Sequence, residues 1–128
     1  MRLLLDTHAL VWWFLDDRRL PPSVDRYLDD PNVTVFVSAV SSWELAIKYR
    51  RGKLREAAYV VENLPDLLRR CNFTPLAITL EHGYRAGLLP GVHKDPFDRM
   101  LAAQAIVDDL SLVTVDPAMA KLGARVIW

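Results

Sequence analysis

The sequence predicts an α/β domain with a mainly parallel central sheet of four to five strands, flanked by helices on both faces. Short apolar or β-branched runs alternate along the chain with longer segments of helical character. A strand that returns to the same sheet through a helix runs parallel to its predecessor, so this order indicates a parallel sheet between two helical layers. The 128 residues suffice for one core, and we expect a single domain over residues 1–128.

The N-terminal quarter predicts one strand and two helices. Leu3–Leu5 is apolar on both sides and too short for a helix, which is typical of a buried strand. Ala9–Leu15 is an apolar segment of helical length. A second helix is expected over Ser23–Asp30, because prolines stand where this helix begins and Pro31 follows its end.

The middle of the chain predicts a strand and two further helices. Val33–Val37 is rich in β-branched and aromatic residues, which favour a strand. Ser41–Arg51 has helical character, and Gly52 is well suited to end it. Glu56–Arg70 carries apolar residues at helical spacing, but Pro65 within it predicts a kink or a break, because proline lacks the N–H that a helix interior needs.

The C-terminal half repeats the alternation. Phe73–Ile78 is expected to contain a short strand, and Leu80–Leu88 forms a helix before a Pro-Gly loop. Pro96–Leu110 is a strongly helical segment whose proline suits the first helical position. The last expected elements are a strand over 112–115, a helix over 117–122 and a strand over 125–127.

Composition limits the classes of function. The chain has 16 basic and 16 acidic residues, and this balance disfavours a protein that coats nucleic acid through overall positive charge. The single cysteine, Cys71, allows neither an internal disulfide nor a zinc site built from several cysteines, which suits a reducing cytoplasm. No stretch approaches the ~20 apolar residues of a membrane span, so no membrane partner is expected.

Two acidic residues follow predicted strands. Asp6 comes directly after the first strand, and Asp116 comes after the strand over 112–115. Ligands in open parallel sheets lie beyond the carboxyl ends of the strands, so both side chains are expected at the functional edge. Each can equally serve as the N-cap of the following helix, by accepting a hydrogen bond from a free backbone N–H.

Three more acidic residues stand at predicted helix starts. Glu44 ends a capping-box pattern that begins at Ser41, and Asp95 precedes Pro96 as an N-cap does. Asp98 falls in the first turn of the same helix, where a carboxylate stabilises the positive end of the helix dipole. Taken singly, each of these residues is explained by capping.

Asp6, Glu44, Asp98 and Asp116 acquire a second interpretation when they are taken as a set. Four like charges that converge at one edge repel one another and raise each other's pKa, unless a cation neutralises them. A donor set of carboxylates without cysteine or histidine favours Mg²⁺ or Mn²⁺ over zinc. The set therefore suggests a site for a hard divalent cation.

Four stretches occur in order and cover nearly the whole chain: LLLDTHAL, SAVSSWELAIKYRRGKL, HKDPFDRMLAAQA and LVTVDPAM. Together they resemble the PIN-domain nucleases, in particular the VapC-type toxins of bacterial type II toxin–antitoxin pairs. The resemblance implies a single PIN-like domain and a Mg²⁺-dependent endoribonuclease whose products end in 5′-phosphate and 3′-hydroxyl. It also implies homodimers and a small VapB-type antitoxin, whose helical tail lies in an apolar groove and blocks the site.

Carried over by motif, the resemblance assigns catalysis and metal binding to Asp6, Glu44, Asp98 and Asp116. We expect Asp6 and Asp98 to bind the metal directly, with Mn²⁺ able to replace Mg²⁺. Glu44 and Asp116 are expected to complete the site or to supply the general base. The residues expected to support these acids from close by are Thr7, Ser38, Asp95 and Thr114.

RNA has to be bound by local positive charge, because the total charge is zero. Lys48 and Arg51 belong to a basic run near the end of the expected helix over 41–51, and Lys94 and Arg99 flank the third acidic motif. All four are candidate RNA contacts. The first two can equally offset the helix dipole, and for Arg99 we favour an ion pair with a neighbouring carboxylate.

Histidines and aromatic residues also stand near the expected site. A role as metal ligands is disfavoured for His8 and His93, because Mg²⁺ seldom binds imidazole. We expect His93 to be a loop residue or a phosphate contact. Trp12, Trp13 and Phe14 are consecutive, so they cannot all lie on one face of a helix and at least one is expected to remain partly exposed. Such an aromatic residue fits the antitoxin groove that the resemblance implies.

Two other classes of function remain open. A receiver-like, Mg²⁺-binding regulatory module also gathers acids at strand ends, but it needs an aspartate at the end of a central strand, and the strand ending at Val37 and Ser38 lacks one. A phosphatase with an Asp-x-Asp motif is disfavoured, because Asp6 is followed by Thr7 and His8. A catalytically silent PIN-like module can be separated from an enzyme only by an assay for RNA cleavage.

Overall fold

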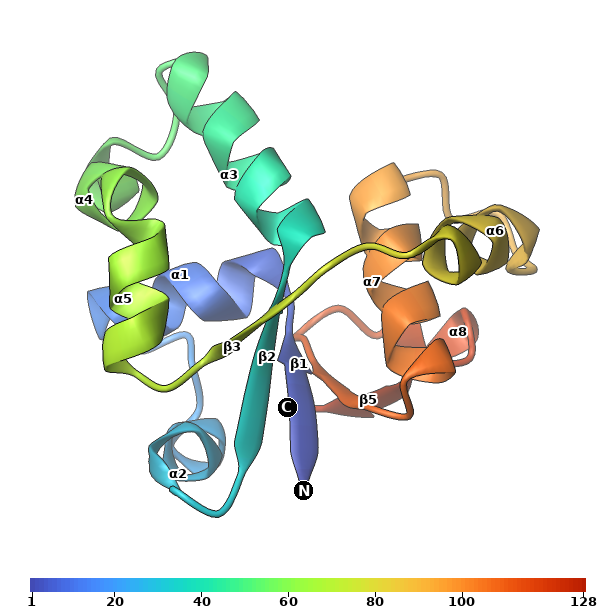
Figure 1. Ribbon diagram of the computed structural model, residues 1–128, viewed down its shortest axis with the longest axis horizontal. Helices are drawn as coiled ribbons and strands as arrows, with labels where there is room; N and C mark the ends of the chain where they lie inside the picture. The colour runs from blue at the N-terminus through green and yellow to red at the C-terminus, as the bar shows by residue number, and fades with distance from the viewer.

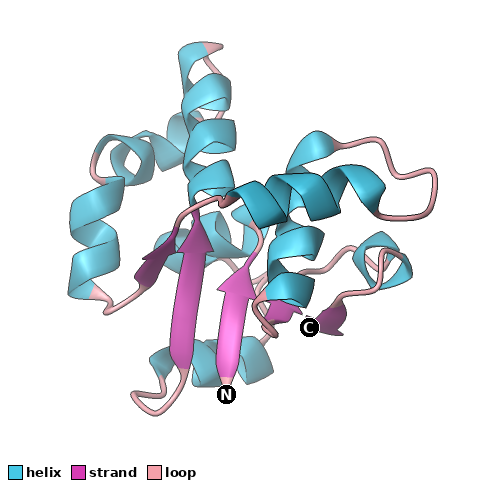
Figure 2. Ribbon diagram, turned by 45° about the vertical axis from the view of Figure 1, so that its right-hand side comes forward, coloured by secondary structure: helices cyan, strands magenta, loops and turns pink.

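The central feature of the computed structural model, which describes residues 1–128, is a five-stranded sheet with helices on both faces (Figure 1). The strands are β1 (Arg2–Leu5), β2 (Thr34–Ser38), β3 (Thr74–Leu76), β4 (Ser111–Val113) and β5 (Arg125–Ile127). They lie in the order β3-β2-β1-β4-β5, and all four pairings are parallel. The predicted α/β class and parallel sheet are confirmed, as the common direction of the strands in Figure 2 illustrates.

Eight α-helices and one 3₁₀ turn connect the strands. They are α1 (Thr7–Leu15), α2 (Pro22–Asp29), α3 (Ala39–Arg50), η1 (Arg55–Ala57), α4 (Ala58–Glu62), α5 (Leu64–Arg70), α6 (Leu80–Leu88), α7 (Pro96–Val107) and α8 (Ala118–Lys121). Helices α1, α2, α4 and α5 cover one face of the sheet, and α6, α7 and α8 cover the other (Figure 1). None of the helices combines the length and the apolar character needed to span a membrane.

The central strand β1 is buried on both faces. Leu3 and Leu5 contribute to the apolar core beneath α1, α2, α4 and α5, whereas Leu4 contributes to the core beneath α6, α7 and α8. All three side chains are fully buried. Successive side chains of a strand point to opposite faces, so one short leucine run supplies both cores.

The order of the strands opens a crevice beside β1. The chain places β2 and β3 on one side of β1, and then returns to place β4 and β5 on the other. The segments that follow β1 and β4 therefore diverge at the carboxyl edge, which is where ligands bind in folds of this kind. Asp6 is fixed at this edge, because its N–H donates a hydrogen bond to the Val113 carbonyl oxygen at 3.0 Å.

Two helices begin earlier than predicted, because residues at the strand ends cap them. Helix α1 begins at Thr7, where the Asp6 carboxylate provides the cap. Helix α3 begins at Ala39, because the Ser38 hydroxyl oxygen accepts a hydrogen bond from the Val40 N–H at 3.0 Å. A residue that ends a strand can thus start the next helix without an intervening loop.

The other departures concern where elements end. The strand predicted over 112–115 is β4 (Ser111–Val113) and ends two residues earlier. Helix α7 ends at Val107, since Asp109 adopts a left-handed φ of 55° and the Leu110 N–H returns to the Ala105 carbonyl oxygen at 2.8 Å. The break predicted at Pro65 is confirmed. The chain forms two helices there, α4 and α5, and Pro65 lies in the first turn of α5, where its missing N–H costs nothing.

Substitution of Leu4 tests the two-sided burial of β1. Leu4→Ala is expected to lower the free energy of unfolding by about 2–5 kcal/mol, because it leaves a cavity in a closed core. Val92→Ala is the control, because 92% of Val92 is exposed. Urea unfolding followed by circular dichroism measures both, and similar effects of the two substitutions would contradict the burial of Leu4.

Candidate active site

A cleft of about 230 Å³ opens beyond the carboxyl ends of β1 and β4, at the edge where the fold places a ligand. The residues that line it are Asp6, Thr7, His8, Glu44, Lys48, Asp95, Asp98, Val115 and Asp116. The fold therefore brings together the four acids that the sequence singled out, and sets Asp95 beside them. These acids come from four segments that are far apart in the chain.

Asp6 is almost fully buried, with 6% of its surface exposed. Its Oδ1 accepts a hydrogen bond from the Ala9 N–H at 2.7 Å, so Asp6 caps α1. Burial raises the pKa of this carboxyl because it disfavours the charged form, whereas the Thr114 hydroxyl and the Ala9 N–H lower the pKa. A cation bound nearby would therefore stabilise the charged form of Asp6.

Glu44 lies on the second turn of α3, so the alternative reading of Glu44 as part of a capping box is wrong. Ser38 caps this helix, and Glu44 is too far along α3 to serve its first turn. Glu44 Oε2 instead accepts a hydrogen bond from Lys48 Nζ at 2.8 Å, one helical turn further on. The pair lines the cleft, so one acid of the set already has a cationic partner.

Asp95 and Asp98 have different roles in the HKDPFDR stretch. Asp95 caps α7, because its Oδ1 accepts hydrogen bonds from the N–H groups of Phe97 at 2.9 Å and Asp98 at 3.3 Å. Asp98 reaches the cleft from the first turn of α7. Burial chiefly raises the pKa of Asp98, the charges of Asp95 and Glu44 raise it further, and the hydrogen bond from His93 lowers it.

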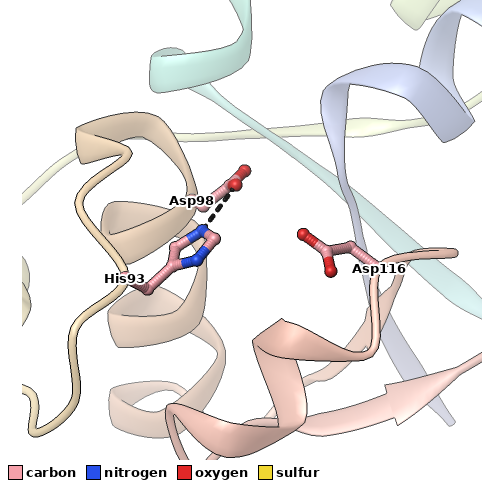
Figure 3. Close-up of side chains that lie close together, drawn as sticks. All are labelled: His93, Asp98 and Asp116. Atoms are coloured by element: carbon pink, nitrogen blue, oxygen red, sulfur yellow. Dashed lines mark hydrogen bonds and ion pairs between the residues drawn. The ribbon is translucent and has the colours of Figure 1, made fainter.

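Asp116 faces Asp98 from the loop after β4 (Figure 3). Its Oδ1 accepts a hydrogen bond at 2.9 Å from the N–H of Ala118, the first residue of α8. The N–H of Asp116 donates a hydrogen bond to Thr114 Oγ1 at 3.1 Å. Thr114 is buried, and its hydroxyl also lowers the pKa of Asp6. One hydroxyl therefore supports the two acids that follow β1 and β4.

The other two expected hydroxyls act on the helices that carry the acids. Thr7 Oγ1 donates a hydrogen bond to Ser41 Oγ at 3.0 Å, which ties the start of α1 to α3. Ser38 Oγ is engaged as the cap of α3. Both residues are buried, and Thr7 also lines the cleft.

His93 belongs to the site, although it is interpreted from the sequence as a loop residue or a phosphate contact. Its Nε2 lies 2.8 Å from Asp98 Oδ2. Single ligand atoms of His93, Asp98 and Asp116 lie within 4.8 Å of one another, a spacing suited to a metal ion. Figure 3 shows the imidazole beside the Asp98 carboxylate, with Asp116 across a gap from both. Asp6 and Glu44 line the same cleft outside this tightest group.

The basic residues considered for RNA contact are placed differently from one another. Lys48 lines the cleft, whereas Arg51 and Lys94 are exposed beyond it. Arg99 departs from the expected ion pair, because its guanidinium donates to three backbone carbonyl oxygens within residues 86–93. In this conformation Arg99 is engaged by the protein itself and is not free to meet a phosphate.

The three aromatic residues at 12–14 are all partly buried and pack against the core beneath α1, so the expectation of partial exposure is confirmed. Trp12 borders a second hollow, of about 130 Å³, which we call the α1–α3 groove. Its lining residues are Thr7, His8, Val11, Trp12, Leu15, Arg19, Leu45, Lys48, Leu54 and Glu56. Thr7, His8 and Lys48 also line the acidic cleft, so the groove and the cleft adjoin.

Comparison with known protein families assigns a family to most of the chain. Residues 3–124 match the family model described as the PIN domain. The chain is 38% identical over 55 residues to Ribonuclease VapC16 of Mycobacterium tuberculosis, a match that spans 43% of this chain and 39% of that protein. It is 29% identical over 121 residues to Ribonuclease VapC22 of the same organism, which is 89% of this chain and 86% of that protein.

Comparison with solved structures supports the fold. The chain is similar to VapBC2 from Rickettsia felis bound to a DNA fragment from their promoter, with a TM-score of 0.74 and 20% identity. That similarity covers 99% of this chain and 98% of the other. At this level of identity the likeness bears on the fold alone, and the fold agrees over the whole length of the chain.

Asp6→Asn is expected to raise the free energy of unfolding of the metal-free protein at neutral pH. The amide oxygen can still cap α1, and the variant no longer buries a charge. In the unmodified protein, burial raises the pKa of Asp6 in the folded state above its ordinary value of 3.8. The charged carboxyl therefore destabilises the folded state fully at pH values above the raised pKa, and no longer does so below pH 3.8. The advantage of the variant should therefore shrink as the pH falls.

Urea unfolding with a chelator present, repeated from neutral to acidic pH, measures the difference between Asp6→Asn and the unmodified protein. Addition of Mg²⁺ or Mn²⁺ at neutral pH should stabilise the unmodified protein more than the variant. An advantage of the variant that grows toward acidic pH would contradict the assigned cause.

Proposed function

The chain belongs to the PIN-domain family, and from this premise we propose that it is a divalent-cation-dependent endoribonuclease, the toxin of a VapBC-type toxin–antitoxin pair. Both relatives named above are ribonucleases by name. One observation carries the proposal: carboxylates from four separate segments line a single cleft at the carboxyl edge of the sheet. Helix capping accounts for single residues, but it does not account for the convergence of four segments on one cleft.

The residues of the cleft fit a divalent cation. Asp98 and Asp116 would hold it, with Asp6 and Glu44 completing the negative set, and carboxylate oxygens are the ligands that Mg²⁺ and Mn²⁺ take. Burial raises the pKa of Asp6 and of Asp98, and a bound cation would relieve that cost. When bound, such a cation polarises a phosphoryl oxygen and lowers the pKa of water.

The side chains of the cleft can bind the phosphate and move the proton. Lys48 Nζ, held beside Glu44 Oε2, offsets charge on the scissile phosphate. Glu44 Oε1, the oxygen that this bond leaves free, accepts the proton of the attacking water, and Asp116 is the alternative base. In-line attack on phosphorus breaks the bond to the 3′-oxygen, which takes up a proton and leaves 5′-phosphate and 3′-hydroxyl ends.

RNA binding is proposed to rest on a few local charges. Lys48 lines the cleft, whereas Arg51 is exposed just after the end of α3 and Lys94 is exposed on the loop before α7. Because the total charge is zero, binding through these residues should be weak and sensitive to salt. We propose the cytoplasm as the place of action, in line with a single cysteine and no internal disulfide.

The α1–α3 groove is proposed as the seat of the antitoxin. It carries Trp12, Val11 and Leu15 from one helix and Leu45 from another, and it adjoins the acidic cleft. An apolar helical tail in this groove would bury the partly exposed Trp12 and extend over the site. The structural neighbour named above is itself a VapBC complex, which supports a partner of this kind.

Homodimers are proposed through the outer face of α6. Leu80, Tyr84 and Leu88 are spaced one helical turn apart, and all three side chains are largely exposed. A continuous apolar stripe of this kind on one helix favours burial against another surface. A second copy of the chain is the occupant that the family resemblance suggests.

The structure also bears on the two alternative functions, a receiver-like module and a catalytically silent PIN-like module. A receiver-like module would need a strand-end lysine near its acceptor aspartate, and although Asp6 follows the central strand β1, none of the five strands ends in a lysine. A catalytically silent PIN-like module would retain the fold and the cleft without cleaving RNA. Measured cleavage therefore decides between enzyme and binding module.

Asp95→Asn and Asp98→Asn form a matched pair of substitutions in one helical turn. Asp98→Asn is expected to reduce divalent-cation-dependent RNA cleavage by about 10²-fold or more, because it removes one of the carboxylates that would hold the cation. Asp95→Asn is expected to lower stability by about 0.5 kcal/mol, through loss of a negative charge at the start of α7, and to keep most activity, since asparagine is also a good cap.

RNA cleavage in Mg²⁺ and in Mn²⁺, together with thermal unfolding of both variants, measures these effects. Full activity of Asp98→Asn would remove this residue from the site. Loss of cleavage in both variants with equal loss of stability would point to a structural cause alone.

Trp12→Ala is expected to weaken binding of the proposed VapB-type antitoxin by about tenfold or more, because a buried tryptophan is a typical anchor of an interface. Tyr59→Ala is the control, since Tyr59 is exposed on α4 and lies outside the groove. Calorimetric titration of each variant with the antitoxin provides the affinities. Unchanged affinity for Trp12→Ala would place the antitoxin elsewhere.

A further inference from the structure

The loop between α6 and α7 is held by an interaction that none of the proposed roles explains. This loop covers residues 89–95, and its surface position is evident from Val92, which is 92% exposed. Gly91 provides the turn, with a φ of 100°. An exposed loop of this kind needs tethers if it is to present a side chain in a fixed position.

Arg99 supplies the tethers from the first turns of α7. Its Nε donates to the Ala86 carbonyl oxygen at 3.1 Å, and its Nη2 donates to that of Leu89 at 2.5 Å. These two contacts satisfy free carbonyl groups at the end of α6. Its Nη1 donates to the carbonyl oxygen of His93 at 3.0 Å. The backbone of His93 is therefore fixed relative to α7, and so relative to Asp98.

The side chain of His93 turns toward the acidic cleft from this fixed backbone. Its Nε2 meets Asp98 Oδ2 at 2.8 Å, and ligand atoms of His93, Asp98 and Asp116 lie within 4.8 Å of one another. Adjacent ligands of an octahedral ion with bonds of about 2.1 Å lie about 3 Å apart, and opposite ligands about 4.2 Å apart. Small rotations of these side chains would therefore close them around one ion.

The group combines one imidazole nitrogen with carboxylate oxygens, and this combination affects which divalent cation binds more tightly. Mg²⁺ prefers oxygen ligands, whereas an imidazole nitrogen favours transition-metal ions, so a nitrogen ligand strengthens binding of Mn²⁺ relative to Mg²⁺. A carboxylate-only site lacks this preference. The three residues of the tightest group contain one such nitrogen.

We propose that His93 is a ligand of the divalent cation, that it makes the site selective for Mn²⁺ over Mg²⁺, and that Arg99 is the residue that positions it. This inference rests on the metal site of the proposed function. The proposal that His93 binds the metal replaces the interpretation of this residue as a loop residue or a phosphate contact. It also gives Arg99 a role that depends on its three carbonyl contacts.

Pulsed electron paramagnetic resonance of the full-length protein loaded with Mn²⁺ tests the ligand directly. The spectrum should show coupling of Mn²⁺ to an imidazole nitrogen, and labelling of the protein with ¹⁵N-histidine should change that coupling. His93→Gln should abolish the signal, because it retains a hydrogen-bond donor for Asp98 but no ring nitrogen. Val92→Ala, from the same loop, should keep the signal.

Affinities for free Mn²⁺ and Mg²⁺ test selectivity without any activity assay. His93→Gln should weaken Mn²⁺ binding by about tenfold or more and weaken Mg²⁺ binding much less, so the ratio of the two affinities should fall. Arg99→Lys should weaken Mn²⁺ binding in the same direction. Added to His93→Gln, it should weaken Mn²⁺ binding no further, because both act through one ligand.

The outcomes separate this inference from the proposed function. Mn²⁺ binding that is lost in Asp98→Asn, without a nitrogen coupling in the unmodified protein, would overturn the role of His93 and leave the metal site intact. Mn²⁺ binding that is unaffected by Asp98→Asn would overturn the metal site and the inference together. The ¹⁵N-histidine experiment shows whether any histidine binds the cation, and because His8 also lines the cleft, His8→Gln, which should keep the nitrogen coupling, separates His8 from His93.

Discussion

Burial of carboxylates at the carboxyl edge of the sheet is the constraint on which the rest of the cleft depends. Asp6 is almost enclosed, and Asp98 is partly enclosed with other acids nearby, so the pKa of each is raised. A hydrogen bond holds each side chain toward the cleft, from the Ala9 N–H to Asp6 and between His93 and Asp98. The protein thus maintains a concentration of negative charge that a bound cation would stabilise.

The parallel sheet explains how four distant segments reach the same cleft. With β1 in the centre and β4 beside it, the residues after these strands meet at one edge, and helices α3 and α7 add their acids from above it. Several of these residues also form helix caps, as Asp6 does for α1 and Asp95 for α7. Capping and site formation are therefore compatible, since a cap fixes the backbone from which a carboxylate projects.

The parts of the site that follow local rules could be predicted from the sequence. Asp6 and Asp116 follow strands, and the division of labour between Asp95 and Asp98 follows from a proline at the first helical position. The start of α3 could not be predicted, because Ser38 ends a strand and caps the helix at the same time, which removed the capping-box explanation of Glu44. Local patterns do not show which of two adjacent caps is used.

The positions of His93 and Arg99 depend on the path of a loop, and no periodicity reveals that path. Arg99 was expected beside a carboxylate, yet its guanidinium holds three carbonyl oxygens. One of those contacts holds the carbonyl oxygen of His93, whose imidazole meets Asp98. Sequence patterns identify the elements that bring charge to the cleft, whereas the long side chains that organise the loop emerge only from the fold.

The central claim is that a divalent cation binds in the cleft and neutralises its carboxylates. Anomalous X-ray diffraction from crystals grown with Mn²⁺ is the most direct test of this claim. A single strong peak between Asp98 and Asp116, at the edge formed by β1 and β4, is the predicted result. Crystals that contain Mn²⁺ but show no peak in this cleft, or show it only at another surface, would contradict the account.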